Sequence, residues 1–170
     1  MNSGKDTLVF LMASLKESQD TVRAYDTKAQ IVGVGYIFAI GIIFEVGNRL
    51  GNSPEMSFVV VALIWLIFIF PITLFGLVLY PTRKTSPRLG AGASDVHRTF
   101  YADLDYIDDV NSYLEIVEAS DPKKEIAYEI VKTAGLREIK RRRFLRALWA
   151  AAISFVLIFL SQLLRAEDLF

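Results

Sequence analysis

The chain has 170 residues, of which 53% are hydrophobic and 22% are charged, and its 19 basic residues balance 19 acidic ones. The zero net charge favours no nucleic-acid partner, and the absence of cysteine excludes disulfides, thiolate chemistry and sulfur-ligated metals. The mean hydropathy of +0.37 lies well above that of a soluble domain, while the charges gather outside the apolar stretches. The composition therefore indicates a membrane protein that also has a polar part.

Residues 1–29 predict an amphipathic helix, because apolar residues recur at three- and four-residue spacing. Asp6 and Thr7 offer an N-cap for this helix. We expect it to continue directly into the first apolar stretch, which covers 31–46 and reaches spanning length as 30–48. The apolar positions of the amphipathic part are Leu8, Leu11, Leu15, Val22 and Tyr25.

Two further apolar stretches are long enough to cross a bilayer. The 23 residues at 58–80 carry no charge and measure about 34 Å as a helix, against about 30 Å of hydrocarbon. Pro71, near the centre of this stretch, lacks an N–H and so frees a backbone carbonyl, which predicts a kink. In the third stretch the one charge, Arg146, lies near enough to the start to snorkel to the headgroups. The expected spans are 30–48, 57–80 and 144–164.

Basic residues predict the orientation of these spans. Of the 19 lysines and arginines, 17 lie in 1–30 and 81–146, and the other two are Arg49 and Arg165. The positive-inside rule therefore predicts a cytoplasmic N-terminus and a cytoplasmic segment 81–143, with the loop 49–56 and the tail 165–170 outside. The basic run at 140–143 is interpreted as the flank that sets this topology. A contact with anionic lipid or a nucleotide phosphate is its alternative.

The segment 81–143 is expected to be a helical sensor region that follows a loop rich in proline and glycine. One helix is predicted from Ser94, and Asp121 and Pro122 are predicted as the N-cap and first residue of another. No segment alternates as a strand does, so the fold class is an all-α integral membrane protein with three transmembrane helices and a cytoplasmic helical region. The apolar positions of the two helices are Phe100, Leu104, Ile107, Leu114 and Val117, then Ile126, Ile130, Val131, Ala134 and Ile139.

Small residues in the first span predict close packing of helices. Gly33, Gly35 and Gly41 would let the backbone of another helix approach. We expect these three glycines at the interface of a homo-oligomer. Packing inside one chain is the alternative that the sequence leaves open.

No residue pattern predicts catalysis or metal binding. The single histidine, His97, has no cluster of ligating residues around it in the sequence. The acidic residues Asp103, Asp105, Asp108 and Asp109 lack a convergent third ligand or base, although Asp105 and Asp109 would share one face of a helix. We therefore expect no enzymatic activity, no metal and no cofactor.

The segment 23–29, which reads RAYDTKA and leads into the first span, resembles a known family. The small membrane effectors of Pycsar anti-phage systems open their first span with a similar Ala-Asp-x-Lys-Ala signature. Other features match the order of elements in this family. They are two spans with a short loop, a proline after the second span, an aromatic-rich helix at 100–104, a long helix at 125–140 and a last span. The resemblance covers nearly the whole chain, and Tyr25 stands where the family usually has alanine.

The resemblance implies a role at the bacterial inner membrane. Such effectors sit beside a cyclase that makes cyclic CMP or cyclic UMP on infection, and the nucleotide triggers the effector to impair the membrane. The implied partners are a cyclic nucleotide, membrane lipids and, through function only, the cognate cyclase. A bound nucleotide needs a cation for its phosphate and an aromatic or apolar surface for its base. The candidate ligand-binding residues are Arg23, Asp26, Lys28, Arg98, Tyr101, Asp103 and Tyr106.

Three alternatives stay open at this point. Asp26 and Lys28 would form interhelical or intersubunit ion pairs at the cytoplasmic rim instead of binding a ligand. A cyclic oligonucleotide, as in CBASS or type III CRISPR-like systems, would replace the cyclic mononucleotide, and the arginines at 141–143 of an oligomer would face its charge. A non-gated membrane scaffold or adaptor is the alternative from another functional class.

Overall fold

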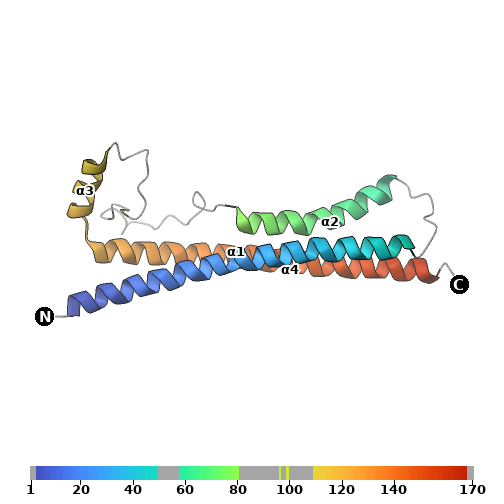
Figure 1. Ribbon diagram of the computed structural model, residues 1–170, viewed down its shortest axis with the longest axis horizontal. Helices are drawn as coiled ribbons and strands as arrows, with labels where there is room; N and C mark the ends of the chain where they lie inside the picture. Colours follow the sequence, from blue (N-terminus) through green and yellow to red (C-terminus); the bar gives the residue numbers. More distant parts are fainter. Residues whose placement is uncertain (1–2, 50–57, 81–95, 97–98, 100–108, 168–170) are drawn as a thin grey trace. The chain divides into compact units, whose positions relative to one another are not determined.

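The structure is a computed structural model, and it describes residues 3–49, 58–80, 96, 99 and 109–167. Within these residues every regular element is an α-helix, as Figure 1 shows. Three helices, α1, α2 and α4, are long and apolar enough to cross a membrane. The expected all-α class is therefore confirmed for the described residues. The helices are α1 (Ser3–Arg49), α2 (Phe58–Leu79), α3 (Val110–Ala119) and α4 (Pro122–Glu167).

α1 is one unbroken helix of 47 residues. It contains no proline, and the carboxylate of Asp6 lies in its first turn, where the positive end of the helix dipole favours it. The N-cap predicted at Asp6 and Thr7 is wrong, because the helix already begins at Ser3. The predicted continuation of the amphipathic part into the first apolar stretch is confirmed.

α2 is a 22-residue apolar helix with Pro71 inside it. The hydroxyl of Thr73 donates to the carbonyls of Ile69 and Phe70 at 2.9 and 2.8 Å, so this polar side chain is satisfied within its own helix. Figure 1 shows α2 bent along its length. The helix is therefore apolar enough for a bilayer without presenting an unsatisfied hydroxyl.

α3 begins later than the helix predicted from Ser94. Asp109 has the extended backbone of an N-cap, with φ −151° and ψ 173°, and its carboxylate accepts a hydrogen bond from the amide of Ser112 at 2.7 Å. The prediction that Asp105 and Asp109 share one helical face is therefore wrong, because Asp109 stands before the helix. The apolar positions that were predicted before it, Phe100, Leu104 and Ile107, lie outside the described residues.

α4 begins where the sequence predicts. The carboxylate of Asp121 accepts a hydrogen bond from the amide of Lys123 at 3.0 Å, and Pro122 is the first helical residue. The helix then continues for 46 residues, through the basic run and the third apolar stretch. No loop separates these parts of α4.

The chain divides into two compact units. The polar unit combines Met1–Arg23 with Thr82–Ile139, and the span unit combines Ala24–Pro81 with Lys140–Phe170. α1 and α4 each contribute residues to both units, because both helices continue across the boundary.

The core of the span unit is built from small and aromatic side chains. Ala29 and Tyr36 of α1, Phe75 and Val78 of α2, and Ala147 and Ala151 of α4 form one buried cluster. Alanines at the crossing points let the helices approach closely, which is how helices associate when lipid removes the hydrophobic drive between them. The large aliphatic and aromatic side chains point outward instead, among them Ile31, Phe38 and Trp149. The span unit therefore presents the apolar exterior that a bilayer requires.

The buried face of α4 in the polar unit carries polar side chains. Glu125, Glu129 and Thr133 recur every four residues and are all buried, with Ile126 beside them. Val131, which the periodicity assigns to the packed face, is exposed. The packed face of this segment within the chain is therefore set by hydrogen-bonding groups as much as by apolar ones.

Candidate functional site

The residues nominated for ligand binding fall into two sets. Arg98, Tyr101, Asp103 and Tyr106 lie outside the described residues. Arg23 belongs to the polar unit, where its exposed guanidinium lies 3.9 Å from the carboxylate of Asp20 on the same helix. Asp26 and Lys28 belong to the span unit. The structure thus gives surroundings for Arg23, Asp26 and Lys28.

An ion pair joins α1 to α4 where their apolar stretches begin. The ammonium group of Lys140 donates to the carboxylate of Asp26, although the two residues are 114 positions apart in the chain. The side chain of Lys140 is only 7% exposed, so its charge depends on this partner. This is the interhelical ion pair that the sequence offers as the alternative to ligand binding at Asp26.

Lys28 differs from its neighbour Asp26. Its ammonium group lies 5.8 Å from the centre of the Tyr25 ring, at a distance suited to a cation–π interaction. The same Tyr25 ring packs against Phe144 of α4, with ring centres 6.1 Å apart. Lys28 itself is exposed. It therefore combines an accessible cation with an aromatic face, which are the two groups that a nucleotide phosphate and base require.

Arg143, the last member of the basic run, caps the C-terminal end of α2. Its guanidinium donates to the carbonyl of Leu77 at 3.0 Å. In a continuing helix the donor for Leu77 would be residue 81, which is a proline without an N–H. A cation at the C-terminal end of a helix is also favoured by the helix dipole. Two cations of the 140–143 run, Lys140 and Arg143, therefore bind groups of this chain.

A hydrogen-bonded relay crosses the interior of the span unit. Pro71 removes the N–H that would have paired with the carbonyl of Ile67 one turn earlier. The hydroxyl of Ser154 on α4 lies 3.2 Å from that carbonyl and 2.7 Å from the hydroxyl of Tyr36 on α1. We call these three groups the membrane clasp. The sequence predicts the freed carbonyl, but nothing in it identifies Ser154 and Tyr36 as partners.

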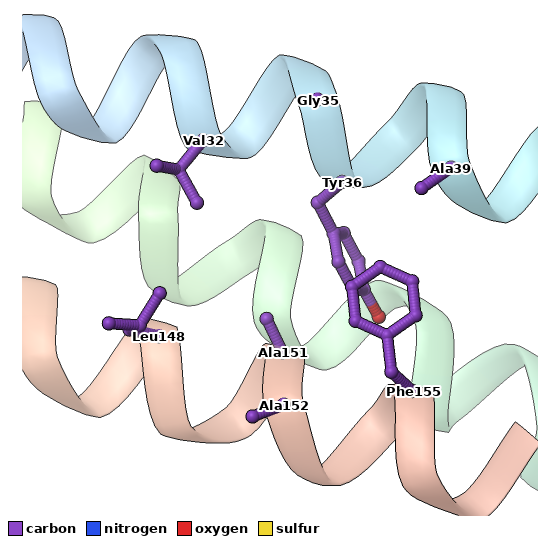
Figure 2. A pocket seen from close by; sticks show the side chains of 8 residues that line it. All are labelled: Val32, Gly35, Tyr36, Ala39, Leu148, Ala151, Ala152 and Phe155. Carbon is purple, nitrogen blue, oxygen red and sulfur yellow. The ribbon is translucent and has the colours of Figure 1, made fainter.

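A shallow apolar groove of about 420 Å³ lies beside the membrane clasp, between α1 and α4. Figure 2 shows the ring of Tyr36 beside the ring of Phe155, and the two centres are 5.1 Å apart in an edge-to-face arrangement. Gly35 lines the groove and has open space around it, as does Gly41 elsewhere on α1. The lining residues are Val32, Gly35, Tyr36, Ala39, Leu148, Ala151, Ala152 and Phe155.

The third glycine, Gly33, has a partner inside the chain. A Cβ atom at Gly33 would lie 3.4 Å from the Cβ of Phe75, so glycine lets α2 approach α1 closely at this point. The three glycines proposed for an oligomer interface are therefore not equivalent. Gly33 serves packing within the chain, and Gly35 and Gly41 leave an open surface on α1.

The polar unit contains a second buried contact that the sequence does not predict. Glu125 is 1% exposed, and one of its carboxylate oxygens accepts from the amide and the hydroxyl of Thr99 at 2.9 and 3.2 Å. The hydroxyl of Tyr113 on α3 donates to the carbonyl of Thr99 at 2.7 Å. Thr99 is thus held by both α3 and α4. We call this group the Thr99 anchor. The every-fourth-residue recurrence of Glu125, Glu129 and Thr133 is the one signal in the sequence that points to it.

Among the residues that the structure describes, no three histidine, cysteine, aspartate or glutamate side chains gather in a way that could hold a metal ion.

Comparison with known proteins gives one match. The family model of the Pycsar effector protein domain, PycTM, matches residues 10–165, which is nearly the whole chain. No curated protein and no solved structure matches the chain.

Proposed function

The chain belongs to the Pycsar effector family of membrane proteins in anti-phage defence, and we propose that it is a second-messenger-gated effector that impairs the bacterial inner membrane. The proposed trigger is cyclic CMP or cyclic UMP, made by a cognate cyclase. The single observation that carries the proposal is the match of the effector domain over residues 10–165. In this proposal the protein acts by rearrangement in the membrane and not by catalysis.

The placement of basic residues supports a cytoplasmic sensor. We propose a multi-pass topology in which the N-terminus and the segment 81–143 face the cytoplasm and the C-terminus faces outward, because 17 of the 19 lysines and arginines fall in 1–30 and 81–146. A cyclase in the cytoplasm releases its product on that side. The polar unit is then on the side where the ligand appears.

Helical continuity supports a route from ligand binding to the membrane. α1 and α4 each carry residues of the polar unit and of the span unit without an intervening loop. A ligand that draws these helices into a new arrangement in the polar unit would therefore move two spans directly. By mass action, a hundredfold preference for the active arrangement supplies about 2.7 kcal/mol of bias.

The ligand site is proposed from the cations and aromatic groups of the cytoplasmic side. Lys28 is the best-supported residue that the structure describes, because it pairs an exposed ammonium group with the Tyr25 ring. Arg23 is a second exposed cation on α1. The remaining proposed contacts are Arg98, Tyr101, Asp103 and Tyr106.

Leakage from vesicles tests the proposal. The purified protein, reconstituted into vesicles that hold a fluorescent dye, should release the dye when cyclic CMP or cyclic UMP is added. Linear CMP and UMP are matched controls, because they carry the same bases and should not cause release. Lys28→Ala should reduce the release while the amount of inserted protein stays the same.

Two outcomes would contradict the proposal. Release on addition of a cyclic oligonucleotide, with none from either cyclic mononucleotide, would assign a different messenger. Intact vesicles under every ligand, together with an unchanged membrane potential in cells that also express a cyclic CMP or cyclic UMP cyclase, would leave a scaffold or adaptor as the function.

A further inference from the structure

The geometry of the membrane clasp determines the direction of its hydrogen bonds. A carbonyl oxygen only accepts, so the hydroxyl proton of Ser154 goes to Ile67. The oxygen of Ser154 then accepts from the hydroxyl of Tyr36. The clasp is therefore an ordered relay from α1 through α4 to α2, and Ser154 is its central member.

The clasp lies deep in the span unit. Ser154 is about 15 Å along α4 from Phe144, where the third apolar stretch begins, at 1.5 Å per residue, which is the middle of a hydrocarbon core of about 30 Å. Tyr36 is 3% exposed and Ser154 is 2% exposed. In this environment no water competes for the three groups, so the Tyr36 hydroxyl and the Ile67 carbonyl depend on Ser154.

Pro71 makes the Ile67 carbonyl depend on another helix. With any other residue at position 71, the backbone N–H would satisfy this carbonyl within α2, whatever α4 did. With proline there, the carbonyl is satisfied only while Ser154 stays in place. The sequence of α2 thus ties a backbone group of one span to the position of another span.

We propose that the membrane clasp is an autoinhibitory contact that holds the three spans in the resting arrangement, and that activation opens it. The inference rests on the proposed function, because it describes how the gated state is restrained. Once open, the clasp leaves the hydroxyl of Tyr36 and the carbonyl of Ile67 in the membrane interior without partners, while the hydroxyl of Ser154 can turn back to a carbonyl of its own helix. Water satisfies both unpartnered groups, so the opened clasp supplies a polar lining for permeation.

The strength of the hydrogen bonds in the membrane clasp suits a switch that a ligand operates. Hydrogen bonds between membrane helices shift an equilibrium by about threefold on average and by about twentyfold at most. Two such bonds are strong enough to keep the resting state dominant. They remain weak enough for a ligand with a hundredfold preference to overcome.

A double-mutant cycle tests the clasp through ligand-free leakage from vesicles. Ser154→Ala removes both bonds and should raise the leak about ninefold without any nucleotide, at about threefold for each bond. Pro71→Ala restores an N–H to pair with Ile67, so in that background Ser154→Ala should raise the leak by a clearly smaller factor. Ser161→Ala is the matched control. Its hydroxyl bonds only to Ile158 one turn back on α4, so it should leave the leak unchanged.

A third variant keeps the test decisive if Ser154→Ala accumulates poorly. Tyr36→Phe keeps the ring against Phe155 and removes only the relay's first donor, so it should raise the leak about threefold. The inference is overturned if Ser154→Ala and Tyr36→Phe leak no more than Ser161→Ala. It is also overturned if the increase in leak of the double variant equals the product of the increases for Pro71→Ala and Ser154→Ala. Independent effects would mean that the hydrogen bond from Ser154 to Ile67 does not couple the two positions.

The two proposals fail separately. A wild-type protein that ignores every cyclic nucleotide, beside a leaky Ser154→Ala variant, would refute the proposed messenger and retain the clasp. A wild-type protein that responds to cyclic CMP or cyclic UMP, beside variants with no ligand-free leak, would retain the messenger and refute the clasp.

Discussion

The span unit and the polar unit bury opposite kinds of side chain. The span unit buries alanines and aromatic rings and exposes large aliphatic residues, as at Ala147 and Ile31. The polar unit buries carboxylates and a threonine along α4, of which Glu125 is the most enclosed. α4 takes part in both patterns without a break. The buried face of this one helix therefore changes from polar to apolar along its length.

The two units also use polar contacts differently. In the span unit, the membrane clasp provides hydrogen-bond partners for polar groups that lipid cannot solvate. The arrangement of the three helices therefore depends on these bonds. In the polar unit, the Thr99 anchor satisfies a buried carboxylate through the amide and the hydroxyl of one residue. The costliest contact to break is expected where a charge is left buried without its partner, as at Lys140 of the span unit.

The largest expected effect comes from the ion pair of the span unit. Asp26→Ala leaves the charge of Lys140 buried without its partner and should destabilise the protein by about 3–5 kcal/mol. Lys140→Ala should cost less, because Asp26 is more exposed than Lys140. Thermal unfolding in detergent measures both. The exchanged pair Asp26→Lys with Lys140→Asp should recover part of the loss, and failure of that recovery would contradict a direct ion pair.

The next effect separates the two glycine environments of α1. Gly33→Leu should overpack the contact with Phe75 and cost about 1–3 kcal/mol, measured by thermal unfolding. Gly41→Leu is the matched control for stability, because open space surrounds it. Native mass analysis of both variants tests the predicted homo-oligomer. If Gly41→Leu loses the oligomer while its stability is unchanged, the open surface of α1 is the oligomer interface. An unchanged oligomer would argue against that interface.

A smaller effect is expected at the Thr99 anchor. Tyr113→Phe removes one hydrogen bond to the carbonyl of Thr99 and should cost about 1 kcal/mol. Glu125→Ala should cost more, because it removes the acceptor of two bonds from Thr99. Hydrogen exchange at the amide of Thr99 reports on both variants. Protection that does not change in Glu125→Ala would show that the amide has another acceptor.

The smallest expected effect is the pH dependence of α3. The backbone amide of Ser112 bonds to the carboxylate of Asp109 and lowers its pKa below the usual aspartate value. A lowered pKa in the folded state means that the carboxylate stabilises α3 at neutral pH and that this contribution is lost only as the pH falls through the lowered value. The protection of the Ser112 amide, which is its exchange rate relative to that of an unstructured amide at the same pH, should therefore be insensitive to this group around neutral pH and should fall in acid. The Asp109→Asn variant should lack this acid dependence.

Local signals in the sequence accounted for most of the secondary structure. The lengths of the apolar stretches predicted the three long apolar helices, and the Asp121–Pro122 pair predicted the start of α4, because hydrocarbon thickness and capping depend on nearby residues alone. The same kind of signal failed before α3. There Asp109 itself has an extended backbone and caps the helix, and an acidic residue in an amphipathic pattern does not reveal whether its side chain caps a backbone or faces solvent.

The sequence by itself determined that Pro71 frees a carbonyl, that 140–143 is strongly basic and that small residues line α1. Only the tertiary structure decided that Ser154 donates to the freed carbonyl and that Lys140 binds Asp26. It also decided that Phe75 occupies the space beside Gly33, while the space beside Gly35 is open. These choices join residues more than 80 positions apart or depend on which helix face meets a neighbour. Periodicity defines a face but not its partner, because any apolar or basic face suits several neighbours until packing excludes all but one.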